Sequence, residues 1–111
     1  MEDVIRKIMI QPEKVEHIIN GCCEYFGLKR EDLQGNNGSR STLWYIKRYM
    51  LVLLKDKTVL STKEIQSLLG YKQQNTVIFH YKNIKDELSD KVYGSQKTKM
   101  IYNELLNYLK L

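Results

Sequence analysis

The sequence predicts an all-α chain folded as a single domain. Apolar residues recur at spacings of three and four along most of the chain, which is the period of an amphipathic helix. No segment of convincing length alternates apolar and polar residues as a half-buried strand does. With 111 residues, of which 42% are hydrophobic, the chain has the size and composition of one compact domain.

A first helix is expected over residues 12–26. Pro12 suits its first turn, where a backbone N–H is not needed, and Gly27 suits its end. A short helical turn is expected at 30–33. The apolar positions of the first helix follow the helical period: Val15, Ile18, Ile19, Cys22 and Phe26.

A second long helix is expected over residues 41–56, after a polar, glycine-containing loop at 34–39. Its wide apolar side predicts that it is the central, most buried helix. Lys47, Arg48 and Lys55 are expected to lie mostly off the apolar stripe. That stripe comprises Leu43, Ile46, Met50, Leu53 and Leu54.

The next segment carries the signals of two helices joined by a short turn. Ser61 and Glu64 have the spacing of a capping box, in which each side chain accepts from the other residue's backbone N–H. Gly70 is expected to end this short helix, and a longer helix begins near Gln73 and ends around 89–90. The core positions of the longer helix are Val77, Tyr81, Ile84 and Leu88.

A last helix is expected over residues 95–110, after a break at Tyr93 and Gly94. It places Ile101, Leu105 and Tyr108 on one side. One domain therefore spans 1–111, with 1–11 as an N-terminal extension that forms either a helix or an arm.

Composition excludes several classes of protein. No apolar run approaches the roughly 18 residues of a membrane span, and the charged N-terminus lacks a signal-peptide core. We therefore expect a cytoplasmic protein. The adjacent Cys22 and Cys23 suit reduced, helix-borne thiols better than a disulfide or a zinc site. Neither His17 nor His80 has a ligand partner at useful spacing, so we expect no metal and no cofactor.

The basic charge is concentrated in the middle of the chain. Residues 40–82 hold eight basic and two acidic residues, a net +6, whereas the whole chain carries +5. A local basic excess is typical of a nucleic-acid footprint, although lysines that merely solvate helix faces give the same pattern.

A short capped helix, a turn at Gly70 and a longer helix have the order of a helix-turn-helix. In that motif the start of the second helix enters the major groove of DNA. Glutamine and asparagine can pair with adenine there, and lysine can donate to guanine. Phe79 lies one turn further on, where it can touch a thymine methyl, and Lys82 can reach a phosphate. The candidate base-reading residues are Lys72, Gln73, Gln74, Asn75 and Thr76.

Two structural alternatives remain open for these residues. The polar run Gln73 to Asn75 can simply cap the helix by satisfying free N–H groups. Phe79 can pack in the core instead of facing DNA.

The same stretch resembles the C-terminal DNA-binding domain of the bacterial replication initiator DnaA, a Trp-repressor-like helical fold. The resemblance covers about residues 10–110 and includes the Asp32-Leu33 pair and the order of the helices. It rests on 61–65, 69–72, 76–78 and 82–84, which read STKEI, LGYK, TVI and KNI.

The resemblance implies roles for matched positions in double-stranded DNA binding. Arg40 corresponds to the loop arginine that reaches the minor groove. Lys47, with Arg48 beside it, corresponds to a phosphate-contacting position, and Lys55, Thr62 and Lys63 match further backbone contacts. At the recognition helix, Lys72 and Thr76 keep the family's residue types, whereas the three residues between them differ. A different or weaker sequence preference is therefore expected.

No phosphate-binding G-x-x-x-x-G-K-[ST] loop is present, so the chain lacks the initiator's nucleotide-binding motif. A stand-alone relative from a phage or other mobile element is expected, acting in replication initiation or transcriptional control. The competing interpretation is a protein-interaction module, such as a phage-type inhibitor or adaptor, on the same scaffold. An enzyme is not expected, because no nucleophile elbow or metal-ligand cluster is evident.

Overall fold

The computed structural model describes residues 12–34, 42–89 and 96–111, and this part of the chain holds five α-helices, one 3-10 helix and no strand. The all-α prediction is confirmed, and each predicted α-helix agrees with the structure to within two residues at either end. The predictions for 1–11, for 35–41 with Arg40, and for the break at 93–94 lie outside the described residues. The elements are α2 (Pro12–Phe26), η1 (Arg30–Gln34), α3 (Thr42–Lys57), α4 (Thr62–Leu69), α5 (Gln74–Leu88) and α6 (Gln96–Leu109).

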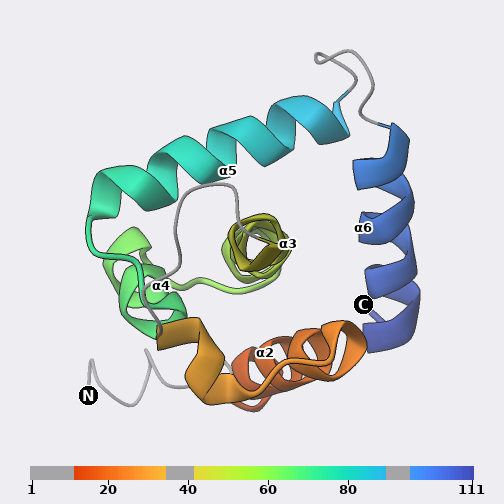
Figure 1. Cartoon of the computed structure of the whole chain (residues 1–111), viewed down its shortest axis with the longest axis horizontal. Helices are drawn as coiled ribbons and strands as arrows, with labels where there is room; N and C mark the ends of the chain where they lie inside the picture. The colour runs from red at the N-terminus through yellow and green to blue at the C-terminus, as the bar shows by residue number, and fades with distance from the viewer. Residues whose placement is uncertain (1–11, 35–41, 90–95) are drawn as a thin grey trace.

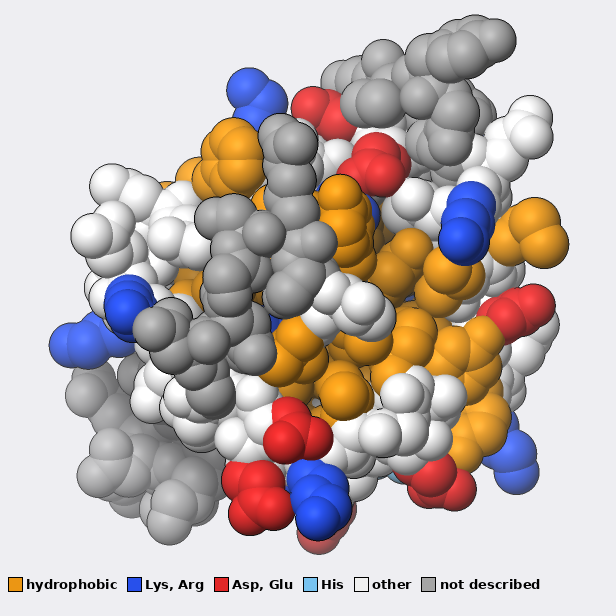
Figure 2. Space-filling view, viewed as in Figure 1, with side chains coloured by type: hydrophobic (Ala, Val, Ile, Leu, Met, Phe, Trp, Pro, Cys, Tyr) orange, Lys and Arg blue, Asp and Glu red, His pale blue; other side chains and the backbone are white. Residues whose placement is uncertain are grey.

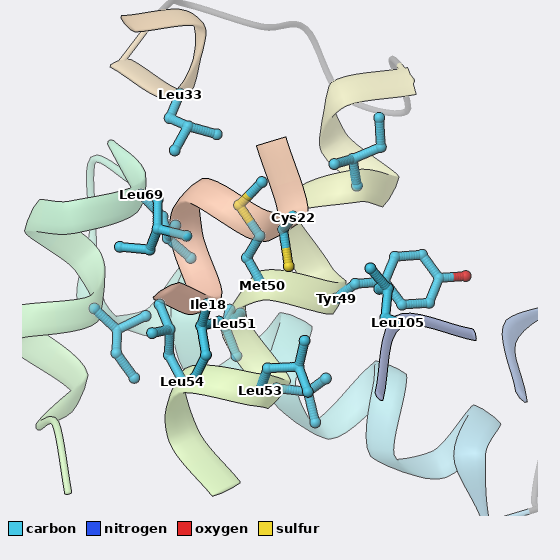
Figure 3. Packing of buried hydrophobic residues seen from close by; sticks show 14 of the residues in the cluster. Ile18, Cys22, Leu33, Tyr49, Met50, Leu51, Leu53, Leu54, Leu69 and Leu105 are labelled. Atoms are coloured by element: carbon cyan, nitrogen blue, oxygen red, sulfur yellow. The ribbon is translucent and has the colours of Figure 1, made fainter. Parts of the chain in front are cut away.

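Helix α3 is the centre of the fold. It is seen end-on in the middle of Figure 1, with α2, α4, α5 and α6 arranged around it. Its residues 46–54 are buried without interruption, because other helices cover every side of it. Figure 3 shows Met50, Leu51, Leu53 and Leu54 among side chains from α2, α4 and α6, such as Ile18 of α2.

The expectation that Lys47 and Arg48 lie off the buried stripe is wrong. Their relative exposures are 5% and 4%, because a helix enclosed on all sides buries its polar positions with its apolar ones. The ammonium of Lys47 lies over the ring of Tyr71, 5.2 Å from its centroid, and burial lowers the pKa of this lysine. Lys55, at the end of α3, is half-buried.

Arg48 joins three helices through one carboxylate. It forms an ion pair with Glu87 of α5, and Thr98 of α6 donates a 2.9 Å hydrogen bond to the other oxygen of that carboxylate. The guanidinium also lies 5.3 Å from the ring of Trp44 and 5.1 Å from that of Tyr45. Arg48 therefore has structural partners that its surface-residue interpretation did not include.

The helix ends follow the predicted capping chemistry. Pro12 opens α2, and Gly27 follows its last residue with φ 70°, the left-handed conformation that glycine tolerates best. Cys22 and Cys23 are free and buried, and burial raises the pKa of the Cys22 thiol to about 12. Among the described helices, none is long and apolar enough to cross a membrane.

Candidate nucleic-acid interface

Helices α4 and α5 form a pair whose turn is firmly held. The capping box is present: Ser61 accepts from the Glu64 N–H at 3.2 Å, and Glu64 accepts from the Ser61 N–H at 3.1 Å. At the other end of α4, Gly70 is left-handed with φ 71°. The side-chain amide of Gln34 in η1 donates to the carbonyls of Ser67 and Leu68, at 3.2 and 3.1 Å.

The turn also packs closely on η1. A Cβ at Gly70 would lie 2.3 Å from the carbonyl oxygen of Leu33, which leaves room for glycine alone. Leu33 is itself buried, and Figure 3 shows it near Leu69 of α4. The direction in which α5 leaves the turn is therefore set by packing as well as by backbone conformation.

The polar run at the start of α5 is exposed. Lys72, Gln73, Gln74 and Asn75 all lie on the surface, and Thr76 is half-buried. Gln73 is the N-cap residue, but its side chain makes no capping hydrogen bond. The structure therefore does not support the capping interpretation of Gln73.

The exposed surface of α5 extends beyond this run along one face of the helix. Gln74, Asn75, Ile78, Phe79 and Lys82 are exposed, and their spacings of three, four and seven residues place them on one side of the helix. Phe79 is 59% and Ile78 55% exposed. The alternative that Phe79 packs in the core is therefore wrong. Sequence reasoning did not select Ile78, although the same spacing identifies it.

The opposite face of α5 packs against α3 and the turn. Val77, His80 and Ile84 are buried, whereas Tyr81 and Leu88, expected in the core, are half-buried. The ring of His80 lies 4.7 Å from that of Trp44 and 5.6 Å from that of Tyr71. Burial, together with nearby Arg48, lowers the pKa of His80.

His80 belongs to a small group of aromatic and basic side chains between α5 and α3. Within the described residues, His80 Nδ1, the Tyr71 hydroxyl and Arg48 Nε are buried without a hydrogen-bond partner. Their packing holds the first turns of α5 against α3.

The basic candidates are not gathered into one patch. Lys63, Lys72 and Lys82 are exposed, Thr62 is half-buried, and Lys47 is buried. In Figure 2 the blue side chains stand apart from one another on the face shown. Helix α4 and the start of α5 lie together at the end of α5 that is farther from α6 (Figure 1), so Lys63, Lys72 and Lys82 belong to neighbouring elements.

A second surface feature is an apolar hollow away from that end. It has a volume of about 500 Å³ and lies between the ends of α2 and α5 and the beginnings of α3 and α6. Phe26, Tyr45, Tyr49 and Ile101 are among the apolar residues that line it. Figure 2 shows apolar side chains gathered on this face.

The histidines and acids do not assemble into a metal centre in the part of the chain that is described: no three His, Cys, Asp or Glu side chains come together there. The Nε2 atom of His17 lies 2.7 Å from the carbonyl oxygen of Leu109. This contact links α2 to the end of α6. That contact gives His17 a structural role.

Comparison of the chain with protein-family models, with curated proteins and with solved structures finds no match. The resemblance to the initiator's DNA-binding domain therefore stays a prediction made from the sequence motifs. The physical argument for function depends on the surface of α4 and α5.

Proposed function

We propose that this protein binds double-stranded DNA through a helix-turn-helix made of α4 and α5, with the first turns of α5 in the major groove. The observation that carries the proposal is the exposed run Lys72 to Asn75. Among the hydrogen bonds of the described residues, none occupies the side chains of Gln73, Gln74 or Asn75. Their amide groups are thus free to pair with base edges.

The mechanism follows from how the two helices are held. Helix α4 is capped at its start and packed on η1 at its end, so α5 presents its polar turn from a rigid support. Lys63, Lys72 and Lys82 are exposed lysines on these elements and suit phosphate contacts that orient the duplex. Arg40 is the candidate for a minor-groove contact by resemblance. Replication initiation and transcriptional control are the two processes that such binding would serve.

The buried lysine and arginine of α3 have a different place in this proposal. Lys47 would support the interface from below through its contact with Tyr71, and Arg48 through its pairing with Glu87. Phosphate contact is assigned to the exposed lysines, because a cation that stays in the core cannot displace counterions from DNA.

The test is binding of purified protein to duplex DNA over a range of salt concentrations. We expect affinity to fall steeply with salt, because each lysine–phosphate contact releases counterions. Lys72→Ala and Lys82→Ala should each reduce the slope of log K against log salt by about 1. Lys110→Ala is the control, because this exposed lysine follows α6, which lies far from α4 (Figure 1), and it should leave the slope unchanged. Gln74→Ala should change sequence preference and keep the slope. Absence of binding at about 50 mM salt would show that the proposal is wrong.

A protein-interaction module is the second candidate function, and the apolar hollow favours it. Tyr45 at its edge is 44% exposed, and tyrosine is enriched at protein interfaces. A protein partner seated there would lose affinity on Tyr45→Ala or Ile101→Ala and would be indifferent to Lys72→Ala. The two candidates therefore respond to variants on different faces.

A further inference from the structure

Two large apolar side chains stand on the outward face of α5. Ile78 and Phe79 expose more than half of their surface, while Val77, His80 and Ile84 of the same helix face the core. A partner that covers the two exposed side chains would gain free energy from removing them from water. Their position on the helix indicates what that partner is.

The apolar pair lies within the polar, base-reading face. Asn75 and Lys82 are seven residues apart and therefore lie nearly in line along the helix, about two turns from one another. Ile78 and Phe79 flank that line on its two sides, since each residue rotates the position by about 100°. Asn75 and Phe79 are separated by about 6 Å along the axis, roughly two steps of a DNA strand.

An A·T base pair matches this arrangement. In the major groove, adenine presents an N7 acceptor and an N6 donor, which an amide side chain can satisfy together, and thymine presents its C5 methyl group. A G·C pair offers no methyl. Arginine, the commonest partner of guanine, is absent from the exposed face of α5 over its described length. Amide and apolar side chains side by side thus complement A·T pairs.

We infer that the target of this face is a run of A·T base pairs, with Gln74 and Asn75 on adenine and Ile78 and Phe79 against thymine methyl groups. The inference rests on the proposed DNA binding and specifies its substrate. Phe79 and Ile78 are then specificity-determining residues, and their exposure in the free protein is explained by the methyl groups that cover them in the complex.

The first experiment removes the methyl group and nothing else. Binding is measured to an alternating dA·dT duplex, to the same duplex with deoxyuridine at every thymidine, and to an alternating dG·dC duplex of equal length. We expect the thymine duplex to bind most tightly, with a loss of about fourfold for each contacted methyl in the uracil duplex. Minor-groove contacts are common to the thymine and uracil duplexes, so the difference reports on the major groove.

Variants assign the effect to side chains. Phe79→Ala and Ile78→Ala should weaken binding to the thymine duplex and leave the uracil duplex less affected, so that the thymine preference shrinks in a double-mutant cycle. Met100→Ala is the matched control, because Met100 is 63% exposed on α6 and apolar. Met100→Ala should change the affinity for neither the thymine duplex nor the uracil duplex. Circular dichroism checks that each variant keeps its helices.

A second substitution tests the adenine contact. Replacing adenine by 7-deazaadenine removes the N7 acceptor, and we expect wild-type binding to weaken by about tenfold or more, in line with the discrimination of a bidentate pair. Asn75→Ala and Gln74→Ala should reduce that sensitivity.

The outcomes separate this inference from the proposed function. Salt-dependent binding with equal affinity for thymine and uracil duplexes, or an unchanged preference in Phe79→Ala, overturns the A·T inference and leaves DNA binding in place. Tighter binding to dG·dC also overturns it. No binding to any duplex at low salt overturns both, and Phe79 is then free to serve a protein partner.

Discussion

His80 shows how a single buried residue of α5 couples packing to pH. It is 3% exposed, packs near the rings of Trp44 and Tyr71, and has Arg48 as a nearby charge. Burial and that charge both disfavour the imidazolium, so the pKa in the folded protein lies below the ordinary value of about 6.5. The neutral ring is the form that the fold accommodates.

We therefore expect the free energy of unfolding to fall as the pH is lowered from about 7 to 5. Below the unfolded pKa the unfolded chain takes up a proton that the folded chain refuses, with a limiting slope of about 1.4 kcal/mol per pH unit. Urea unfolding at a series of pH values measures this. His80→Gln should flatten the dependence. An unchanged pH profile in His80→Gln would contradict the assignment.

Gly27 and Gly70, the glycines with positive φ among the described residues, give a residue-scale test of the turn before α5. Gly27→Ala meets no atom within 4 Å, so it should cost about 1 kcal/mol from conformation alone. Gly70→Ala should cost clearly more, because its Cβ also collides with the backbone of Leu33. Thermal or urea unfolding of the two variants compares the costs. Equal losses would show that the packing of η1 on the turn contributes nothing.

At the scale of one element, α4 is a short helix whose stability comes from its ends and its buried face. Isolated helices of this length are marginal in water, so capping and packing must hold it. Its buried residues are Ile65 and Leu69, and its capping box satisfies backbone donors at the start. A support this short can position α5 only if both its ends stay fixed.

Ser61→Ala should therefore destabilise the protein by about 1 kcal/mol, since it removes the side-chain acceptor for the Glu64 N–H. Ser67→Ala in the same helix is the control. Ser67 is exposed and contributes its backbone carbonyl to Gln34, so its substitution should be neutral or slightly stabilising. Urea unfolding distinguishes the two. If Ser61→Ala left the free energy of unfolding unchanged, the cap would contribute no stability beyond that of the packing of α4.

At the scale of the whole molecule, polar contacts between helices help to fix the position of α5 relative to α3 and α6. Near the end of α3, Asp56 accepts from the Tyr81 hydroxyl at 2.7 Å and from the Lys85 ammonium at 2.9 Å. Toward its beginning, Arg48 pairs with Glu87, which also binds Thr98. Helix α5 is thus attached to α3 at two places.

Glu87→Gln should destabilise the fold by about 3 kcal/mol, because it leaves the buried guanidinium of Arg48 without a counter-charge. The lower end of the usual range is expected, as the Glu87 side chain is 22% exposed. Glu16→Gln, which breaks the exposed pair with Arg30, should cost less than about 1 kcal/mol. Measured free energies of unfolding of the two variants test this ordering. A larger loss in Glu16→Gln would contradict the claim that the Arg48–Glu87 pair contributes more to stability than the exposed pair.

The helices and their boundaries were predictable from the sequence because their signals are local. The spacing of Ile18 and Cys22, the capping pair Ser61 and Glu64, and the stop at Gly70 act within a few residues of chain. The place of the polar run Gln73 to Asn75 at the start of α5 was predictable for the same reason, since the run precedes the first apolar position of that helix.

Burial on α3 was not predictable in the same way. Lys47 and Arg48 carry charges that favour the surface, and neighbours distant in sequence, Tyr71 and Glu87, help to make their burial tolerable. Ile78 illustrates the converse, since its apolar side chain suggests a core position, but the core side of α5 is already occupied by Val77, His80 and Ile84.

The sequence by itself thus determined the helical class, the order of the elements and the polar start of α5, since periodicity and capping are short-range properties of the chain. The tertiary structure alone decided which basic residues reach solvent and which apolar residues of α5 remain uncovered. Those outcomes depend on which helices pack around α3. The sequence pattern of a helix indicates how wide its buried face is, but it does not indicate which partner covers that face.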